Sequence, residues 1–230
     1  MKKLGFTLAE VLITLGVIGV VAAITIPGLI SNYRKRQLEE QIKVNYSSIQ
    51  QTMRFMDEEG LSYEIFKDGS DASMKEWYES FIEKHMKVES VCINTAGCWH
   101  KQGVALELNG NKNGWESNIG WGINILTFIT AKGAYFDMDG HAPGACTSKF
   151  GVDTTTSCLV IYFDANGASK PNRVGKDIHA LVWTEKGLVP AGNDRTKEEI
   201  DQECLTGSGY FCLQKIIEQG WEIPDQVWRR

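Results

Sequence analysis

The sequence has little of what usually marks an enzyme. Only four histidines occur in 230 residues, and they are scattered along the chain. There is no Gly-x-Ser-x-Gly nucleophile elbow and no glycine-rich loop of the kind that holds a phosphate. No cysteine is matched with a distinct base and an orienting group, as a catalytic thiol requires. We therefore predict a protein without enzymatic activity and interpret each histidine as an ordinary surface or core residue: His85, His100, His141 and His179.

Excess positive charge and repetitive sequence are also missing. The chain carries 24 lysine and arginine residues against 29 aspartate and glutamate residues, which gives a net charge of −5. An acidic protein does not attract nucleic acid through its bulk charge, so we predict no nucleic-acid partner. Internal repeats and low-complexity linkers do not occur, and residues 58–230 are enough for one compact domain rather than two.

Charge is almost absent from the N-terminal part of the chain. Residues 6–26 contain a single charged residue, Glu10. As a helix that rises about 1.5 Å per residue, this segment is just long enough to cross the roughly 30 Å hydrocarbon core of a bilayer. It is longer than the apolar core of a secretory signal peptide, which has about 7 to 15 residues. We therefore predict a transmembrane helix over residues 6–26, in which an acid such as Glu10 indicates a functional role.

The residues around Glu10 resemble a known processing signal. A basic leader, residues 1–5, precedes the sequence GFTLAEVLITLGVIG, which begins at Gly5. This stretch resembles the prepilin signal of type IV pilins and type II secretion pseudopilins, and the likeness extends over about residues 1–57. The resemblance implies that a prepilin peptidase cleaves the chain between Gly5 and Phe6 and that the new amine of Phe6 is methylated.

The same resemblance implies a function and a place in the cell. The chain would be a structural subunit of a type IV pilus or a type II secretion pseudopilus. It would be stored in the inner membrane, with its C-terminal domain outside the cytoplasm, and polymerised through its N-terminal helix after cleavage. Its partners would be the peptidase, other pilin or pseudopilin subunits, the inner-membrane assembly platform and the membrane. The size of the domain favours a minor subunit.

Two other functions remain open at this point. The chain could be an adhesive or DNA-uptake subunit at a filament tip, which predicts ligand binding by the domain. It could also be a membrane-anchored binding domain that never polymerises, which predicts that the bond after Gly5 stays intact.

Glu10 and Pro27 are the predicted assembly residues. After cleavage the Phe6 amine is a cation four residues before Glu10, within reach on one helix face, and the amine of a neighbouring subunit could also serve. In the family this pairing is thought to set the register of assembly; the alternative is a solvated, unpartnered Glu10 at headgroup depth. Pro27 cannot donate a hydrogen bond to the Ala23 carbonyl, so a kink is expected. In the family a proline here marks a helix that partly melts in the filament; alternatively, it only ends the span.

Charges that flank the span do not fix its orientation. Lys2 and Lys3 precede it, but three cations follow it closely. A count of these charges gives no preference for a cytoplasmic leader under the positive-inside rule. The cations after the span are Arg34, Lys35 and Arg36.

The six cysteines give a clearer signal, because all of them lie downstream of the span and form an even set. Disulfides persist in oxidising compartments, which predicts a C-terminal domain outside the cytoplasm. Six cysteines allow 15 connectivities. The three sequential pairs are the simplest: Cys92 with Cys98, Cys146 with Cys158, and Cys204 with Cys212. The alternative is a zinc site at Cys92, Cys98 and His100, although this spacing matches no common zinc pattern.

The hydrophobic pattern predicts an α+β fold, in which a long N-terminal helix over residues 6–57 packs on an antiparallel β-sheet. The second half of this helix has one apolar stripe at helical spacing: Leu38, Ile42, Tyr46, Ile49, Met53 and Met56. The residues Ser73 and Glu76 form a capping-box pattern that predicts a further helix over residues 74–86. Turns are expected at Gly133 and Gly187. β-Branched and aromatic residues predict strands at residues 104–108, 123–129, 134–138, 159–163 and 179–183.

Residues 164–177 have strong turn chemistry. Asp and Asn side chains bond to nearby backbone amides, Gly permits positive φ and Pro presets a turn, so a rigid surface loop is predicted. Similar loops in pilin-like proteins imply a role in closing the sheet edge. Calcium held by Asp164, Asn166 and Asp177 is the alternative, although the loop lacks the glycine and acidic positions of an EF-hand.

Two smaller features complete the predictions. Asp137 and Asp139 suggest a second acidic turn, for which a metal is a weaker alternative. A short helix is expected from Cys212 to a stop at Gly220. Two aromatic residues near the C-terminus are interpreted as edge-packing side chains: Trp221 and Trp228.

Overall fold

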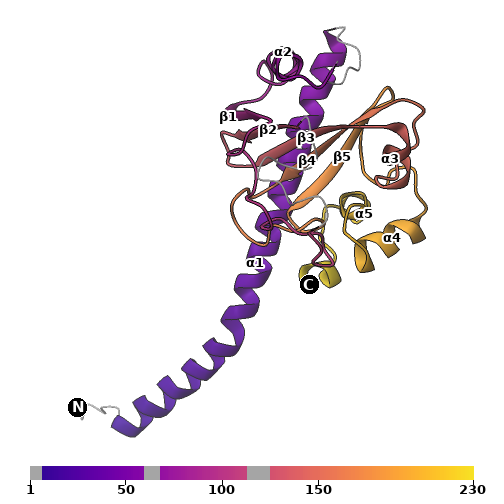
Figure 1. Cartoon of the computed structure of the whole chain (residues 1–230). Helices are drawn as coiled ribbons and strands as arrows, with labels where there is room; N and C mark the ends of the chain where they lie inside the picture. Colours follow the sequence, from indigo (N-terminus) through magenta and orange to yellow (C-terminus); the bar gives the residue numbers. More distant parts are fainter. Residues whose placement is uncertain (1–6, 60–67, 113–124) are drawn as a thin grey trace. The chain divides into compact units, whose positions relative to one another are not determined.

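A long helix and an antiparallel sheet make up the fold, as the sequence predicts (Figure 1). The structure, a computed structural model, describes residues 7–59, 68–112 and 125–230. Helix α1 is Leu8–Glu58. The chain divides into two compact units, Met1–Gln37 and Leu38–Arg230, so α1 begins in the first unit and ends in the second. The predicted processing residues Gly5 and Phe6 lie outside the described residues.

The second unit is built on six antiparallel strands that follow one another in sequence order (Figure 1). Antiparallel neighbours can be joined by short hairpins, as β2 and β3 and as β5 and β6 are, whereas longer segments join the other pairs. Four of the predicted strands are confirmed as β2 to β5. The strands are β1 Val88–Ile93, β2 Ile125–Thr130, β3 Tyr135–His141, β4 Cys158–Asp164, β5 Ile178–Thr184 and β6 Gly187–Pro190.

The prediction of a strand at residues 104–108 is wrong. Within this segment only Leu106 makes a strand-like bridge, to Arg173. The chain then turns at Gly110, which has a φ of 90°. The Asn109 side chain stabilises this turn by accepting the Asn111 N–H at 2.8 Å. Local turn chemistry therefore prevails over the apolar pattern. The sequence does not predict the two edge strands, β1 and β6, which are the least buried strands of the sheet.

Helix α2 begins earlier and ends earlier than the predicted helix at residues 74–86. Its N-cap is Ser70, whose hydroxyl accepts the Ser73 N–H at 3.2 Å, so Ser73 lies inside the helix rather than capping it. After Phe81 the helix gives way to a turn that leads into β1, and Met86, which lies in this connecting segment, is buried. The helices after α1 are α2 Asp71–Phe81, α3 Pro143–Ser148, α4 Lys197–Thr206, α5 Cys212–Glu218 and α6 Asp225–Trp228.

The stem, which we define as residues 38–58 of α1, packs on one face of the sheet (Figure 1). Five of the six predicted stripe residues are buried, and Tyr46 is partly buried against the same core. Alternate residues of β2 to β5 face this core because successive side chains of a strand point to opposite faces. They include Phe128, Phe136, Phe163 and Trp183.

The C-terminal tail closes over the stem. Helix α5 ends before Gly220, which has a φ of 77°, and the Trp221 N–H returns to the Ile216 carbonyl at 2.7 Å. The Trp221 ring then packs edge-on against Tyr46, with 5.1 Å between ring centroids. Two residues later, the Ile223 N–H donates to the Glu39 carboxylate at 2.8 Å. The predicted helix stop and the edge-packing role of Trp221 are confirmed.

Candidate functional site

The first unit is a helix whose apolar side chains are uncovered. Large hydrophobic residues from Leu8 to Ile30 are exposed, with exposed fractions of 78% at Leu8 and 72% at Leu29. Among the residues that the structure describes, α1 is the one helix long and apolar enough to cross a membrane, and no residue of its most apolar stretch is buried. Contiguous apolar surface of this size marks a site of contact with lipid or protein. The first unit is therefore a candidate membrane span.

Glu10, in the first turn of α1, forms a capping box with Thr7. The Thr7 N–H and the Thr7 hydroxyl both donate to Oε2 of Glu10 at 2.8 Å, and the Thr7 hydroxyl oxygen accepts the Glu10 N–H at 3.3 Å. This arrangement satisfies N–H groups that have no partner inside the helix. The Thr-x-x-Glu pattern could have predicted it. Glu10 therefore has a partner within its own chain, and its predicted pairing with Phe6 stays a prediction because Phe6 lies outside the described residues.

Pro27 lies inside α1, and the helix continues beyond it for more than thirty residues, to Glu58. The proline therefore does not end the helix. Because it has no N–H, the carbonyl of Ala23 has no donor at the usual position. This is a built-in weak point of the helix, and its partial melting in a filament stays a prediction.

The loop between β4 and β5 holds two buried carboxyl groups side by side. Asp164 at the end of β4 and Asp177 just before β5 are both fully buried. Oδ2 of Asp164 lies 2.8 Å from Nε2 of His100, and Oδ1 accepts the Asn166 N–H at 3.1 Å. The two oxygens of Asp177 accept backbone N–H groups of residues 172 and 173, each at 2.7 Å. The two acids thus tie the loop to itself and to the segment around His100.

Burial sets the protonation of this cluster. It raises the pKa of Asp164 well above its usual value and raises the pKa of Asp177 to about 8, to which the repulsion between the two carboxyl groups in their charged forms also contributes. Burial also lowers the pKa of His100 to about 4. The neutral forms of all three groups are favoured, because a charge without solvent is costly. A protonated Asp164 keeps Oδ1 as an acceptor and directs its proton from Oδ2 to His100.

The three residues of the calcium alternative do come together. In the amide orientation that the surrounding acceptors require, the Asn166 side-chain nitrogen donates to Asp164 at 2.7 Å, to Asp177 at 3.2 Å and to the Ser169 carbonyl at 3.0 Å. A donor in this position satisfies both carboxyl groups without a cation. Across residues 7–59, 68–112 and 125–230, no group of three or more His, Cys, Asp or Glu side chains is positioned to hold a metal ion. The residues therefore fit a hydrogen-bonded lock for the loop.

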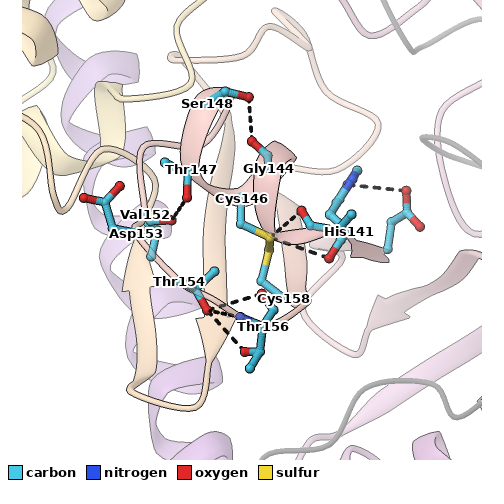
Figure 2. Close-up of a disulfide and its surroundings, with 12 residues drawn as sticks. His141, Gly144, Cys146, Thr147, Ser148, Val152, Asp153, Thr154, Thr156 and Cys158 are labelled. Atoms are coloured by element: carbon cyan, nitrogen blue, oxygen red, sulfur yellow. Dashed lines mark hydrogen bonds and ion pairs between the residues drawn. A yellow bond between two sulfur atoms is a disulfide. The ribbon is translucent and has the colours of Figure 1, made fainter.

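The six cysteines form the three sequential disulfides that the sequence predicts, with Cys92 bonded to Cys98, Cys146 to Cys158 and Cys204 to Cys212. Figure 2 shows the second of these, which fastens α3 to the start of β4. The zinc alternative is wrong, because its two cysteines are oxidised and its histidine contacts Asp164.

The predicted acidic turn at Asp137 and Asp139 is wrong, because both residues lie within strand β3. They face away from the stem, since Met138 between them packs in the core with the stem. Oδ2 of Asp139 lies 3.5 Å from Nε2 of His141, close to the disulfide of Figure 2. Burial raises the pKa of Asp139 to about 7 and lowers that of His141 to about 4, so burial disfavours the charged form of each group.

Comparisons with known proteins give no further guide to the site. No protein-family model matches the chain, and no curated protein or solved structure matches it either.

Proposed function

We propose that this protein is a structural subunit of a type IV pilus or a type II secretion pseudopilus. One observation carries the proposal: an uncovered apolar helix begins with the Thr7–Glu10 capping box, directly after the Gly5–Phe6 junction of the prepilin-like signal. The subunit is stored in the inner membrane as a single-pass protein. After leader cleavage it polymerises through its N-terminal helix.

The exposed helix needs a cover in both states. Burying one Leu, Ile or Val side chain contributes about 1.5–3 kcal/mol, and residues 8–30 present many such side chains to their surroundings. Lipid covers them during storage. In a filament the equivalent helices of other subunits replace the lipid, so the same surface serves for membrane insertion and for assembly.

Glu10 gives the assembly step its register. The carboxylate accepts hydrogen bonds from Thr7 in the isolated chain. In the filament we expect it to pair with the methylated amine of Phe6 on a neighbouring subunit, because an ion pair is worth more where water is excluded. Before assembly, Thr7 of the capping box is the hydrogen-bond partner of the Glu10 carboxylate.

The disulfides support a location outside the cytoplasm for the domain. All three lie in the second unit, and disulfides persist where the compartment is oxidising. Contact with the prepilin peptidase and the inner-membrane assembly platform follows from the same pathway. Final locations are the cell surface for a pilus and the periplasm for a pseudopilus.

Intact-mass measurement tests the proposal most directly. The full chain is produced in a host with a prepilin peptidase and in a matched host without one, and the N-terminal peptide is sequenced. We expect a chain that begins at methylated Phe6 only in the first host, and no cleavage of a Gly5→Leu variant. An uncleaved Met1 chain in both hosts would make this protein a permanently anchored membrane protein instead.

A further inference from the structure

The polar end of the exposed helix carries a group of cations that pilin assembly leaves unexplained. Residues 11–33 of α1 contain no charged residue, and three cations follow at once: Arg34, Lys35 and Arg36. Lys35 is partly buried and has an interaction partner of its own, which leaves the two arginines. Both arginines are exposed, and within the described part of the chain neither forms an ion pair. All of these residues belong to the first unit, so their spacing along the helix is fixed by helix geometry.

The axial spacing puts these arginines at headgroup depth. The exposed apolar residues continue to Ile30, four residues beyond the predicted span at 6–26, and the uncharged stretch after Glu10 therefore extends past it. Residues 11–30 of this stretch are about 30 Å long as a helix, equal to the hydrocarbon core of a bilayer. Arg34 and Arg36 then lie about 6–9 Å farther along the axis, within the headgroup layer. The exposed aromatic Tyr33 occupies the boundary, where aromatic side chains are enriched.

The angular spacing argues for a partner that surrounds the helix. Successive residues of an α-helix are about 100° apart, so Arg34 and Arg36 point to nearly opposite sides. One docked protein helix would meet only one of them. A headgroup layer meets both.

We propose that Arg34 and Arg36 bind anionic phospholipid headgroups of the outer leaflet. The proposal rests on the proposed function in one respect: the C-terminal end of the span must face away from the cytoplasm. Cations on that side are disfavoured by the positive-inside rule, and anionic lipid offsets this cost. The headgroups hold the stored subunit at a fixed depth until assembly removes it.

Lipid selectivity of the full chain in bilayers tests the proposal. The probes are spin-labelled phosphatidylglycerol and spin-labelled phosphatidylcholine, and their relative association with the protein is measured by electron paramagnetic resonance. All variants carry Lys2→Gln and Lys3→Gln, so that the cations of the leader do not contribute. We expect a preference for phosphatidylglycerol that weakens at high salt, with a contribution of at most about fivefold from each arginine.

Three variants make the test specific. Arg34→Gln with Arg36→Gln should remove most of the preference. Lys84→Gln with Lys132→Gln changes the net charge equally at exposed positions of the domain and should leave the preference intact. Arg34→Lys with Arg36→Lys should also retain it, because a headgroup layer attracts any cation, whereas a carboxylate site shaped for guanidinium would not accept lysine equally.

The outcomes separate this proposal from pilin assembly. Equal association of both lipids with the parent chain would overturn headgroup binding. So would an equal loss of the phosphatidylglycerol preference in the Arg34→Gln/Arg36→Gln variant and in the Lys84→Gln/Lys132→Gln control. Neither result depends on cleavage at Gly5, because the measurement uses the unprocessed chain. Release of the parent chain from membranes by alkaline carbonate would instead remove the basis of both proposals.

Discussion

Replacement of Ile42 by alanine tests whether the stem is part of the domain core. Ile42 is fully buried in the core cluster that includes Phe136 and against which Trp221 packs. If the stem only led into the domain, its loss of packing would have little effect on domain stability. If the stem completes the core, as its burial indicates, the domain should weaken markedly.

The expected cost follows from the atoms removed. Isoleucine to alanine deletes three carbon atoms, and each buried methylene is worth about 0.8 kcal/mol, which gives about 2.4 kcal/mol. The cavity left behind adds to this, so we expect the free energy of unfolding to fall by about 3–4 kcal/mol. The matched control is Val44→Ala, one half-turn away on the same helix, where the side chain is 43% exposed and the change should stay within about 0.5 kcal/mol.

Urea unfolding of the full chain in mild detergent, followed by tryptophan fluorescence, measures the difference. All seven tryptophans lie downstream of the stem, so the signal reports on the second unit and not on the span. A loss of 3 kcal/mol lowers the urea midpoint by about 1–3 M at an unchanged slope. Equal midpoints for Ile42→Ala and Val44→Ala would refute the idea that the stem forms part of the core.

Three further predictions concern assembly, a tight turn and pH. Glu10→Ala should leave leader cleavage intact but impair incorporation into filaments, and normal incorporation in a pull-down of sheared filaments would reject the charge-register idea. Gly167→Ala should cost at least about 2 kcal/mol, because φ is 58° and a Cβ would stand 2.1 Å from a carbonyl oxygen of the β2–β3 turn. Gly140→Ala, whose Cβ meets nothing within 4 Å, is its control. The folded pKa of Asp177, about 8, exceeds its unfolded value of about 3.9, so the stability contributed by its neutral form is lost as pH rises through that interval. The low pKa of His100, about 4, acts in the opposite sense only below about pH 6.5. The thermal midpoint should therefore fall between about pH 6.5 and 8, and a constant midpoint over this interval would contradict the assignment of buried acids.

The sequence is most informative where one physical effect dominates. The stem stripe follows from a 3.6-residue period of large apolar side chains. The central strands follow from short apolar runs rich in β-branched and aromatic residues, which suit a strand buried in a sheet. The sequential disulfides bridge residues only 6, 12 and 8 positions apart, so little of the fold had to be known to pair them. Edge strands β1 and β6 lack such runs, because Glu89 and Ser90 interrupt β1 and β6 is a four-residue strand that begins with Gly187 and ends with Pro190.

The buried acids show what the sequence cannot supply. Asp137 already lies in the predicted strand at residues 134–138, whereas Asp139 follows it with the composition of a turn, and only the pairing of β3 with β4 places Asp139 on a strand. The contact between His100 and Asp164 joins residues 64 positions apart, and no local pattern announces it. Polar contacts of this kind depend on the tertiary fold, because each group tolerates burial only where its partner arrives.

The two parts of α1 differ in packing: the stem belongs to the domain core, and the residues before Leu38 do not. The stem, the sheet and the tail satisfy one another: Trp221 packs on Tyr46, and Ile223 donates its N–H to Glu39. The core that these elements form begins at Leu38 and includes no residue of the span. The apolar surface of residues 8–30 therefore has to be covered from outside the described part of the chain. In the proposed function a membrane covers this surface in the stored protein, and the same helix of other copies would cover it in a filament.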